Sequence, residues 1–235
     1  AFLMLLRVRE ESVEELAGFV KACREFINPE LIKITNVDLD LGCYAGKRRH
    51  LPWFLLAVIC LVQEGNKVFL HGTKELDSNR LYLPEVFKAL NFPISHNKQE
   101  INTHLAHFGF AYMDLAHVSP PLDKLIQMRS LFGLRSPANT LARMLNPVKA
   151  TYSYHGVFHR HFAERHAEVA KLLGDNQVSC VRGEGGEVEV NPERAFNQYL
   201  CRNGEVTQIT FPELLEQRQI KPRELNPIEL EKVWT

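Results

Sequence analysis

The chain has 235 residues, and its 28 basic and 28 acidic side chains give a formal net charge of zero. This length is sufficient for one large domain, or for a domain with part of another, around a well-buried core. The balanced charge excludes a molecule whose whole surface attracts polyanions, so any such affinity must come from a local patch. The five cysteines form no CxxC pair, which excludes a zinc knuckle and favours a reducing, cytoplasmic environment. The longest apolar run, residues 51–62, is too short to cross a membrane.

The first residues have the pattern of a helix entered in its middle. They read AFLMLLRVRE, without an initiator methionine or an N-cap residue, and we therefore expect the sequence to be a fragment. Ser12 and Glu15 then form a capping box, and apolar residues recur at helical spacing up to Phe26. This spacing predicts an amphipathic helix, which the Asn28-Pro29 pair ends.

A strand, turn, helix, strand unit is predicted next. Apolar residues at a period of two predict a strand between Leu31 and Leu41, interrupted at Asn36. The basic turn that follows leads into a helix from about Pro52 to Gly65, and residues 67–71 (KVFLH) predict a short buried strand. Such a unit is expected to be parallel and right-handed.

The remaining sequence continues this alternation of strands and helices. Helices are predicted at residues 85–90, 121–132 and 137–145 and before Leu173-Gly174, and strands at 108–113, 152–158 and 178–182. Asn203-Gly204 between two apolar segments predicts a hairpin. The last residues predict a linker and a short capped helix. We therefore expect an α/β fold with a mainly parallel central sheet flanked by helices on both faces.

The first candidate site is the basic turn GCYAGKRRH, residues 42–50. It lies where a strand ends and a helix begins, and free amides and the helix dipole favour an anion at such a position. Lys47, Arg48 and Arg49 add cationic groups, and guanidinium groups suit the paired oxygens of phosphate. The alternative is a solvated turn with three flexible cations.

Three further segments carry groups that can do chemistry, and each has a structural alternative. The acidic, glycine-containing residues 183–189 can hold magnesium or can form a surface loop, which we favour. Arg135, Asn139 and Arg143 share one side of a helical segment and can line a basic groove or lie on an ordinary surface. Four histidines without a clear third ligand are expected to face solvent or a carboxylate rather than a metal: His155, His159, His161 and His166.

Several segments, taken in order, resemble a known family. AFLMLLRVREESVEELAGFVKA, FLHG, GLRSPANTLARMLNP, GVFH and VRGEGGEVE are similar to anthranilate phosphoribosyltransferase and its relatives in the nucleoside phosphorylase superfamily. The resemblance covers almost the whole chain. It implies a small helical domain that forms a homodimer contact and a larger α/β domain, with the active site between them. We expect residues 1–27, joined by helices within 120–146, in the helical domain, and residues 28–119 and 147–235 in the α/β domain.

The family's reaction, as the resemblance implies it, is attack of the anthranilate amine on the ribose carbon of phosphoribosyl pyrophosphate. Magnesium and a glycine-rich GTGGDG loop hold the diphosphate. This loop falls on residues 42–47, where Gly42 is kept, Tyr44 and Ala45 replace glycines, and Gly46 replaces the aspartate. A tyrosine is a steric obstacle where backbone must approach diphosphate. The His71-Gly72 pair is kept, but its flanking lysine, asparagine and arginine are replaced by Leu70, Thr73 and Lys74.

The metal-binding and anthranilate regions also depart from the family pattern. The Asp-Glu metal pair falls on Val188 and Glu189, which leaves Glu189 as the remaining metal candidate. Arg135 and Asn139 match the family's arginine and asparagine, and Arg135 is interpreted as a retained anion contact. Arg143 replaces a proline of the family's GPL motif.

These changes replace metal-chelating residues and glycines with positively charged residues. In this respect the chain resembles the YbiB-like branch of the family, whose members are called glycosyl transferase family proteins. That resemblance implies a homodimer with basic grooves that binds nucleic acids, prefers single strands and has little sequence specificity. We therefore expect a non-catalytic cytoplasmic protein that binds single-stranded DNA or RNA, without a cofactor or membrane, through Lys47, Arg48, Arg49, Arg135 and Arg143. The alternative is a surviving phosphoribosyltransferase that uses magnesium and an aromatic acceptor, supported by Arg135, Asn139, His71-Gly72 and the acidic loop.

Overall fold

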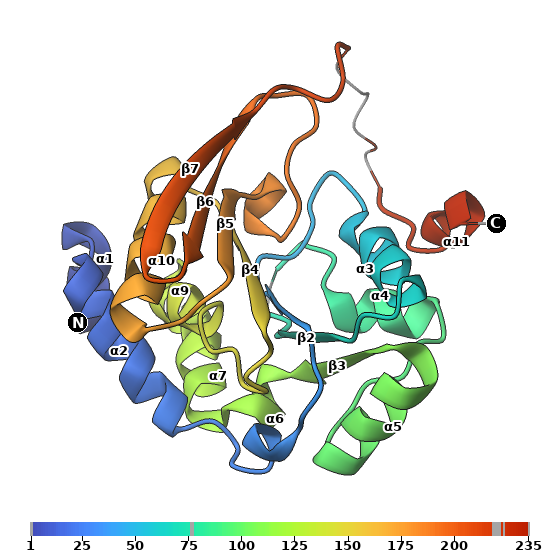
Figure 1. Ribbon diagram of the computed structural model, residues 1–235, viewed down its shortest axis with the longest axis horizontal. Helices are drawn as coiled ribbons and strands as arrows, with labels where there is room; N and C mark the ends of the chain where they lie inside the picture. Colours follow the sequence, from blue (N-terminus) through green and yellow to red (C-terminus); the bar gives the residue numbers. More distant parts are fainter. Residues whose placement is uncertain (1, 76–77, 218–221, 223, 235) are drawn as a thin grey trace.

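The computed structural model describes residues 2–75, 78–217, 222 and 224–234. Its centre is a seven-stranded sheet in the order β3-β2-β1-β4-β5-β6-β7 (Figure 1). Strands β1 to β5 pair in parallel, and β6 and β7 add an antiparallel hairpin at one edge. The expected α/β class is confirmed. The strand bounds are β1 Leu39–Cys43, β2 Val68–Gly72, β3 Phe110–Asp114, β4 Tyr152–Val157, β5 Val178–Arg182, β6 Phe196–Arg202 and β7 Glu205–Phe211.

Helices cover both faces of the sheet because the strand side chains alternate between two cores. In β2, Phe69 packs in a core with α5, α6 and α7, whereas Val68 and Leu70 pack in a second core with α3, α4 and α11. Every residue of β2 is buried, as expected for a parallel strand covered on both sides. The helix bounds are α1 Phe2–Arg9, α2 Val13–Glu25, α3 Phe54–Gln63, α4 Leu83–Ala89, α5 Lys98–Phe108, α6 Leu115–Val118, α7 Pro120–Gln127, α8 Arg129–Phe132, α9 Ala138–Ala142, α10 Arg160–Leu173 and α11 Glu229–Trp234.

The local signals in the sequence mostly act as predicted. Ser12 and Glu15 form the capping box of α2, with the Glu15 amide donating to Ser12 Oγ at 3.2 Å. The turn at Asn203-Gly204 connects β6 and β7, and both residues have positive φ, as a tight hairpin turn requires. Helix α3 begins just after Pro52 and ends before Gly65, as predicted.

One secondary-structure prediction was wrong, and one helix was missed. The predicted strand between Leu31 and Leu41 is a 3₁₀ turn, Leu31–Lys33, followed by irregular chain, and β1 begins only at Leu39. Asn36 has a φ of 62°, which breaks an extended strand, and Ile34 and Val37 are buried without strand pairing. Helix α5 was not predicted, although its signals are present: Asn97 is its N-cap and Gly109 its left-handed C-cap.

Helix α2, near the start of the chain, packs beside α10. Leu16 and Val20 of α2 share a core with Leu141, Met144 and Val169. Figure 1 shows α1 and α2 on the side of the molecule away from α3 and α4. The division into a helical and an α/β domain stays a prediction.

Candidate functional site

The basic turn lies at the carboxyl ends of the parallel strands, where ligands of α/β sheets bind. It follows β1, and its Lys47 forms a bridge with Leu81 through two backbone hydrogen bonds of 2.8 Å. The carboxyl ends of β2, β4 and β5 lie on the same side of the sheet as this turn, because these strands run parallel to β1. Gly46 has a φ of +68°, and a Cβ there would lie 2.7 Å from the Tyr82 ring, so the turn requires glycine at this position.

The anion-binding amides of this turn already hold a carboxylate of the same chain. Glu187 Oε1 accepts hydrogen bonds from the amides of Ala45, at 2.7 Å, and Gly46. The Glu187 side chain is buried. Its backbone lies close to the residue that follows β5: a Cβ on Gly183 would lie 1.7 Å from the Glu187 carbonyl oxygen. An internal anion therefore occupies the position that the sequence assigned to phosphate.

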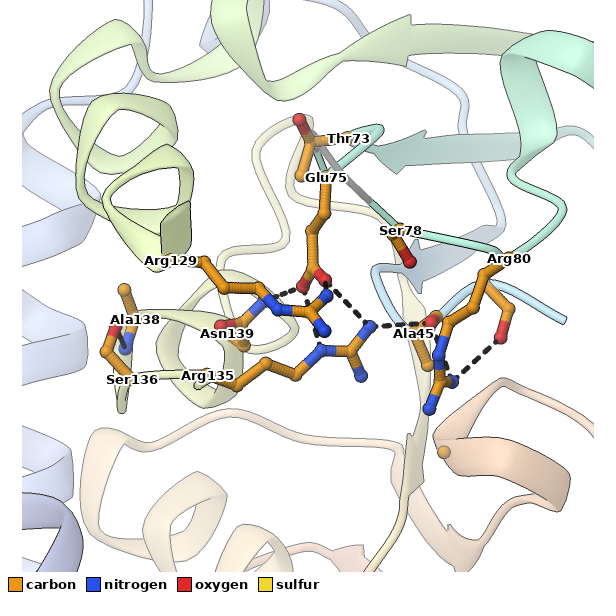
Figure 2. Close-up of polar contacts among 12 residues, drawn as sticks. Ala45, Thr73, Glu75, Ser78, Arg80, Arg129, Arg135, Ser136, Ala138 and Asn139 are labelled. Atoms are coloured by element: carbon orange, nitrogen blue, oxygen red, sulfur yellow. Dashed lines mark hydrogen bonds and ion pairs between the residues drawn. The ribbon is translucent and has the colours of Figure 1, made fainter. Parts of the chain in front are cut away.

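A second buried carboxylate, Glu75, collects the groups predicted to contact a ligand. Figure 2 shows Arg129, Arg135 and Asn139 pointing toward it. Arg135 Nε lies 2.8 Å from Glu75 Oε1, Asn139 Nδ2 donates to Oε1 at 2.9 Å, and Arg129 forms a further ion pair. Tyr82 donates from its hydroxyl to Glu75 Oε2 at 3.1 Å. The two predicted contacts in this set, Arg135 and Asn139, thus have an internal partner.

Arg135 connects this cluster to the basic turn, and Arg80 contacts the same turn. Arg135 Nη2 donates to the Ala45 carbonyl at 2.7 Å, and Arg80 Nη1 donates to the carbonyls of Ala45 and Gly46 at 3.0 and 3.2 Å (Figure 2). Sequence reasoning missed Glu75. The signal available was a carboxylate just past the end of β2, because arginines placed in a buried cleft need an opposite charge.

Tyr44 lies in the core beside the sheet. It is fully buried, and its hydroxyl hydrogen-bonds to His71 Nδ1 at 2.5 Å. His71 Nε2 lies 3.2 Å from Asp40 Oδ1. Since a carboxylate only accepts, His71 Nε2 donates to Asp40, and Nδ1 forms the hydrogen bond with the Tyr44 hydroxyl. Burial raises the pKa of Tyr44 well above its ordinary value, so the phenol stays protonated.

The retained glycines, Gly42 and Gly72, lie at the ends of β1 and β2, and Arg143 lies beside the first of them. A Cβ on Gly42 would lie 3.0 Å from the Arg143 Cα. The Arg143 side chain is buried, donates to the carbonyls of Asn139 and Gly186, and has its pKa lowered to about 10, chiefly by burial. Arg143 therefore contacts the loop that carries Gly186 and is not part of the exposed phosphate-binding surface that the sequence had predicted.

The metal candidate Glu189 is paired with Lys47. Lys47 Nζ lies 3.0 Å from Glu189 Oε2, and the same oxygen accepts from the Phe54 amide at 3.3 Å. Burial raises the pKa of Glu189 although Lys47 opposes this change. Within the described ranges, no group of three or more metal-ligating side chains is found. With an ammonium on Glu189 and two amides on Glu187, the donor set does not fit the magnesium ion that the family implies.

The predicted histidine set separates into buried and surface residues. His155 and His166 are buried with ring centroids 5.4 Å apart, and His155 Nδ1 lies 3.6 Å from the Cys180 thiol. Burial lowers the pKa of His155 to about 4 and that of His166 well below its ordinary value. His159 is exposed and is the N-cap residue of α10, and His161 is exposed in its first turn.

A basic cavity of about 610 Å³ opens at the basic turn. Five of the arginines that line it are exposed, and within the described part of the chain none of these five has an ion pair or a side-chain hydrogen bond: Arg48, Arg49, Arg160, Arg182 and Arg194. Phe158, Phe196 and Tyr199 also line it, and Glu184 is its one acidic lining residue among those described. Lys47 and Arg80 also line it, and both have the internal partners given above.

Sequence reasoning found two of the five exposed arginines of this cavity. Arg160, Arg182 and Arg194 are single cations separated along the chain, and only the folded sheet brings them together. The sequence did hold a signal for two of them: Arg182 ends β5 and Arg160 follows β4. The carboxyl ends of both strands lie on the side of the sheet that carries the basic turn.

Comparison with known proteins defines the family. Residues 58–229 match the model of the glycosyl transferase family a/b domain, and residues 1–27 match that of the family's helical bundle domain. The chain therefore belongs to this glycosyl transferase family, whose members resemble anthranilate phosphoribosyltransferase. The membership is distant: the chain is 25% identical over 226 residues to anthranilate phosphoribosyltransferase of Bacillus cereus, and 30% identical over 197 residues to an uncharacterized protein of Aquifex aeolicus.

Solved structures share the fold. Anthranilate phosphoribosyltransferase from Saccharomyces cerevisiae, in complex with PRPP and Mg, superposes on 99% of the chain with a TM-score of 0.73 at 20% identity. The Thermus thermophilus enzyme superposes on 89% with a TM-score of 0.72 at 22% identity. The chain spans 66% and 62% of these two structures, and 66% and 58% of the Bacillus and Aquifex relatives. Among the described residues no helix is long and apolar enough to cross a membrane.

Proposed function

We propose that this protein is a non-catalytic, sequence-nonspecific nucleic-acid-binding protein that prefers single strands. The observation that carries the proposal is the basic cavity with five exposed arginines, none of which has an ion pair among the described residues. Guanidinium groups without internal partners can contact the oxygens of successive phosphates. Because the chain has no net charge, this local patch supplies the affinity.

Helix α10 supports an anionic ligand at the same place. Arg160 and Ala163, in its first turn, line the cavity, and its N-cap residue makes no side-chain hydrogen bond to the helix amides. No acidic side chain lies in this first turn. Free amides at a helix N-terminus favour phosphate, and the adjacent arginines add charge to that preference.

Phosphoribosyl transfer is the less favoured function for this chain. The amides of Ala45 and Gly46 are held by Glu187, Tyr44 fills core space, and Lys47 neutralises Glu189. Each of these contacts uses a group that the family's reaction needs for diphosphate or magnesium. The family membership gives the fold and the position of the cleft, while the internal ion pairs argue against a substrate inside it.

We propose in addition that the protein acts as a homodimer. Helix α1 presents Phe2, Leu5 and Val8 with 62, 68 and 85% of their surface exposed, which supports a contact through this face. A two-fold axis would double each basic cavity, so that one strand can contact two of them. Light scattering on wild type and on Leu5→Glu tests this contact. A dimer that the variant converts to monomer supports it, and a monomeric wild type removes it.

The binding experiment uses a fluorescent single-stranded oligonucleotide and two proteins with matched charge changes. One variant removes Arg48 and Arg49 (both to Ala), and the control removes Lys21 and Lys171, which are exposed and outside the cavity. We expect the arginine variant to bind at least tenfold more weakly at low salt, because a phosphate that no arginine neutralises keeps its counterions and releases none on binding. The control should bind like wild type. Equal affinity of wild type and the arginine variant would remove the basis of the proposal.

A further inference from the structure

An exposed phenylalanine lies among the arginines of the basic cavity. Phe158, between β4 and α10, lines the cavity and keeps 56% of its surface exposed. Its ring makes an edge-to-face contact with His159, with the centroids 5.0 Å apart. A large apolar side chain gains little for folding at this exposure, so its contribution to the stability of the core does not explain its position.

A second aromatic surface lines the same cavity from the hairpin. Phe196 of β6 stacks on Phe211 of β7 with ring centroids 5.1 Å apart and an angle of 15° between the rings. Tyr199 follows on β6 and also lines the cavity. The stacking on Phe211 holds the Phe196 ring in place, so the cavity has an exposed aromatic side chain at Phe158 and a braced one at Phe196.

We propose that this cavity takes an unpaired nucleobase, which stacks on the ring of Phe158 while its flanking phosphates contact Arg160 and Arg182. The inference rests on the proposed function and identifies Phe158 as the residue that contacts the base. A volume of about 610 Å³ lies within the range of small-molecule pockets and has room for a nucleotide. Bases in a duplex are already stacked and paired, so a cavity of this kind selects single strands.

Charge and aromatic surface have separate consequences for binding. The arginines contact phosphate, which every strand carries, whereas Phe158 contacts a base, which an abasic strand lacks. Stacking on an aromatic ring tolerates any base sequence because every base has a π face. Phe158 is therefore the residue that distinguishes a base-bearing strand from a bare phosphate chain of equal charge.

The test compares two fluorescent strands of about 12 nucleotides, a length within usual site sizes: oligothymidylate and an abasic strand with the same number of phosphates. Wild type is expected to bind oligothymidylate about tenfold more tightly than the abasic strand. Phe158→Ala and Phe158→Leu should bind both strands with the affinity that wild type has for the abasic one. Phe158→Trp should keep the preference, and Phe26→Ala, at an exposed phenylalanine outside the cavity, should behave as wild type.

Each outcome decides between the two proposals. If Phe158→Ala keeps the preference for oligothymidylate, stacking on Phe158 is refuted while nucleic-acid binding stands. Equal affinity of wild type for the two strands would also refute stacking on Phe158 and leave nucleic-acid binding in place. If thymidine monophosphate displaces oligothymidylate at equal molar concentration, the cavity belongs to a free nucleotide and the strand assignment is wrong. If wild type binds neither strand at low salt, the proposed function itself fails.

Discussion

The carboxylate of Glu187 accepts a hydrogen bond of 2.7 Å from the amide of Ala45, in the turn that the sequence assigned to an external anion. Glu187 lies more than a hundred residues further along the chain and reaches the turn because β1, β4 and β5 are neighbours in the sheet. Together with Glu75, whose carboxylate pairs with Arg129 and Arg135, it supplies negative charge at this site from inside the protein. The exposed arginines that remain face the adjacent cavity, and this separation is the basis of the proposed function.

Removing the charge of Glu187 should destabilise the protein. In Glu187→Gln the amides of Ala45 and Gly46 keep a weaker acceptor, and the buried Arg143 loses its neighbouring negative charge. We expect the free energy of unfolding to fall by about 1–3 kcal/mol, measured by urea titration. Glu205→Gln, at an exposed position on β7, should change it by less than about 0.5 kcal/mol. A Glu187→Gln variant as stable as the control would show that this carboxylate does not hold the turn.

Glu75 should contribute more than an exposed ion pair does. Glu75→Ala leaves Arg129, Arg135 and Asn139 without their common acceptor, and we expect a loss of about 2–4 kcal/mol. This expected loss of stability is smaller than that for breaking a fully buried ion pair, because both guanidinium groups are partly exposed. Glu30→Ala, which breaks the exposed pair with Lys33, should cost less than about 1 kcal/mol. Similar denaturation midpoints for the two variants would contradict the role of Glu75.

Restoring the family's glycine at Tyr44 should damage the core rather than recover a substrate loop. Tyr44→Gly removes a fully buried aromatic ring, and we expect a loss of at least about 3 kcal/mol in calorimetric stability. Tyr44→Phe keeps the ring but leaves His71 Nδ1 without its donor, for an expected loss of about 1–3 kcal/mol. Tyr152→Phe, at a half-exposed tyrosine, is the control. If Tyr44→Gly binds phosphoribosyl pyrophosphate with magnesium while wild type does not, Tyr44 only blocks an otherwise intact substrate site. The conclusion that this site no longer fits the substrate would then be wrong.

The stability should fall in mild acid because of two buried histidines. Burial lowers the pKa of His155 to about 4, below the ordinary value of about 6.5, so the unfolded chain binds protons more readily than the folded one. This contribution is fully present above pH 6.5 and is lost as the pH falls toward 4. His155 alone should lower the free energy of unfolding by about 2 kcal/mol at pH 5. His166, lowered in the same direction, adds to the effect.

Thermal unfolding of wild type and of His155→Asn/His166→Asn, followed between pH 7.5 and 4.5, measures this dependence. The double variant is expected to be less stable at neutral pH but to show a flatter decline below pH 6.5. Parallel declines for the two proteins would mean that other groups cause the acid sensitivity.

The sequence predicts the parts of this fold whose signals are local. The capping box at Ser12, the proline before α3 and the Asn203-Gly204 turn each act within a few residues, and each is where it was predicted. The apolar spacing before β1 was misleading because Ile34 and Val37 are buried by irregular chain rather than by strand pairing. Burial produces the same apolar positions whether or not the backbone is extended.

The site was predictable at its position but not in its contacts. The basic turn lies at the strand ends, as its place between a strand and a helix indicated. Which carboxylate fills it could not be read from the sequence, because residues 184–189 offer three glutamates and only the fold turns Glu187 to the amides. Arg160, Arg182 and Arg194 were missed for the same reason, since each is an isolated cation until the sheet forms.

The dependence of oligonucleotide affinity on salt tests the central claim most directly. For single strands, the logarithm of the binding constant falls against the logarithm of salt concentration with a slope of about −0.7 per phosphate contact. Arg48→Ala/Arg49→Ala/Arg160→Ala should therefore bind with a slope about 2 units shallower than wild type, while Lys21→Ala/Lys171→Ala should keep the wild-type slope. A triple variant with the wild-type slope would show that the strand's phosphates do not contact the basic cavity.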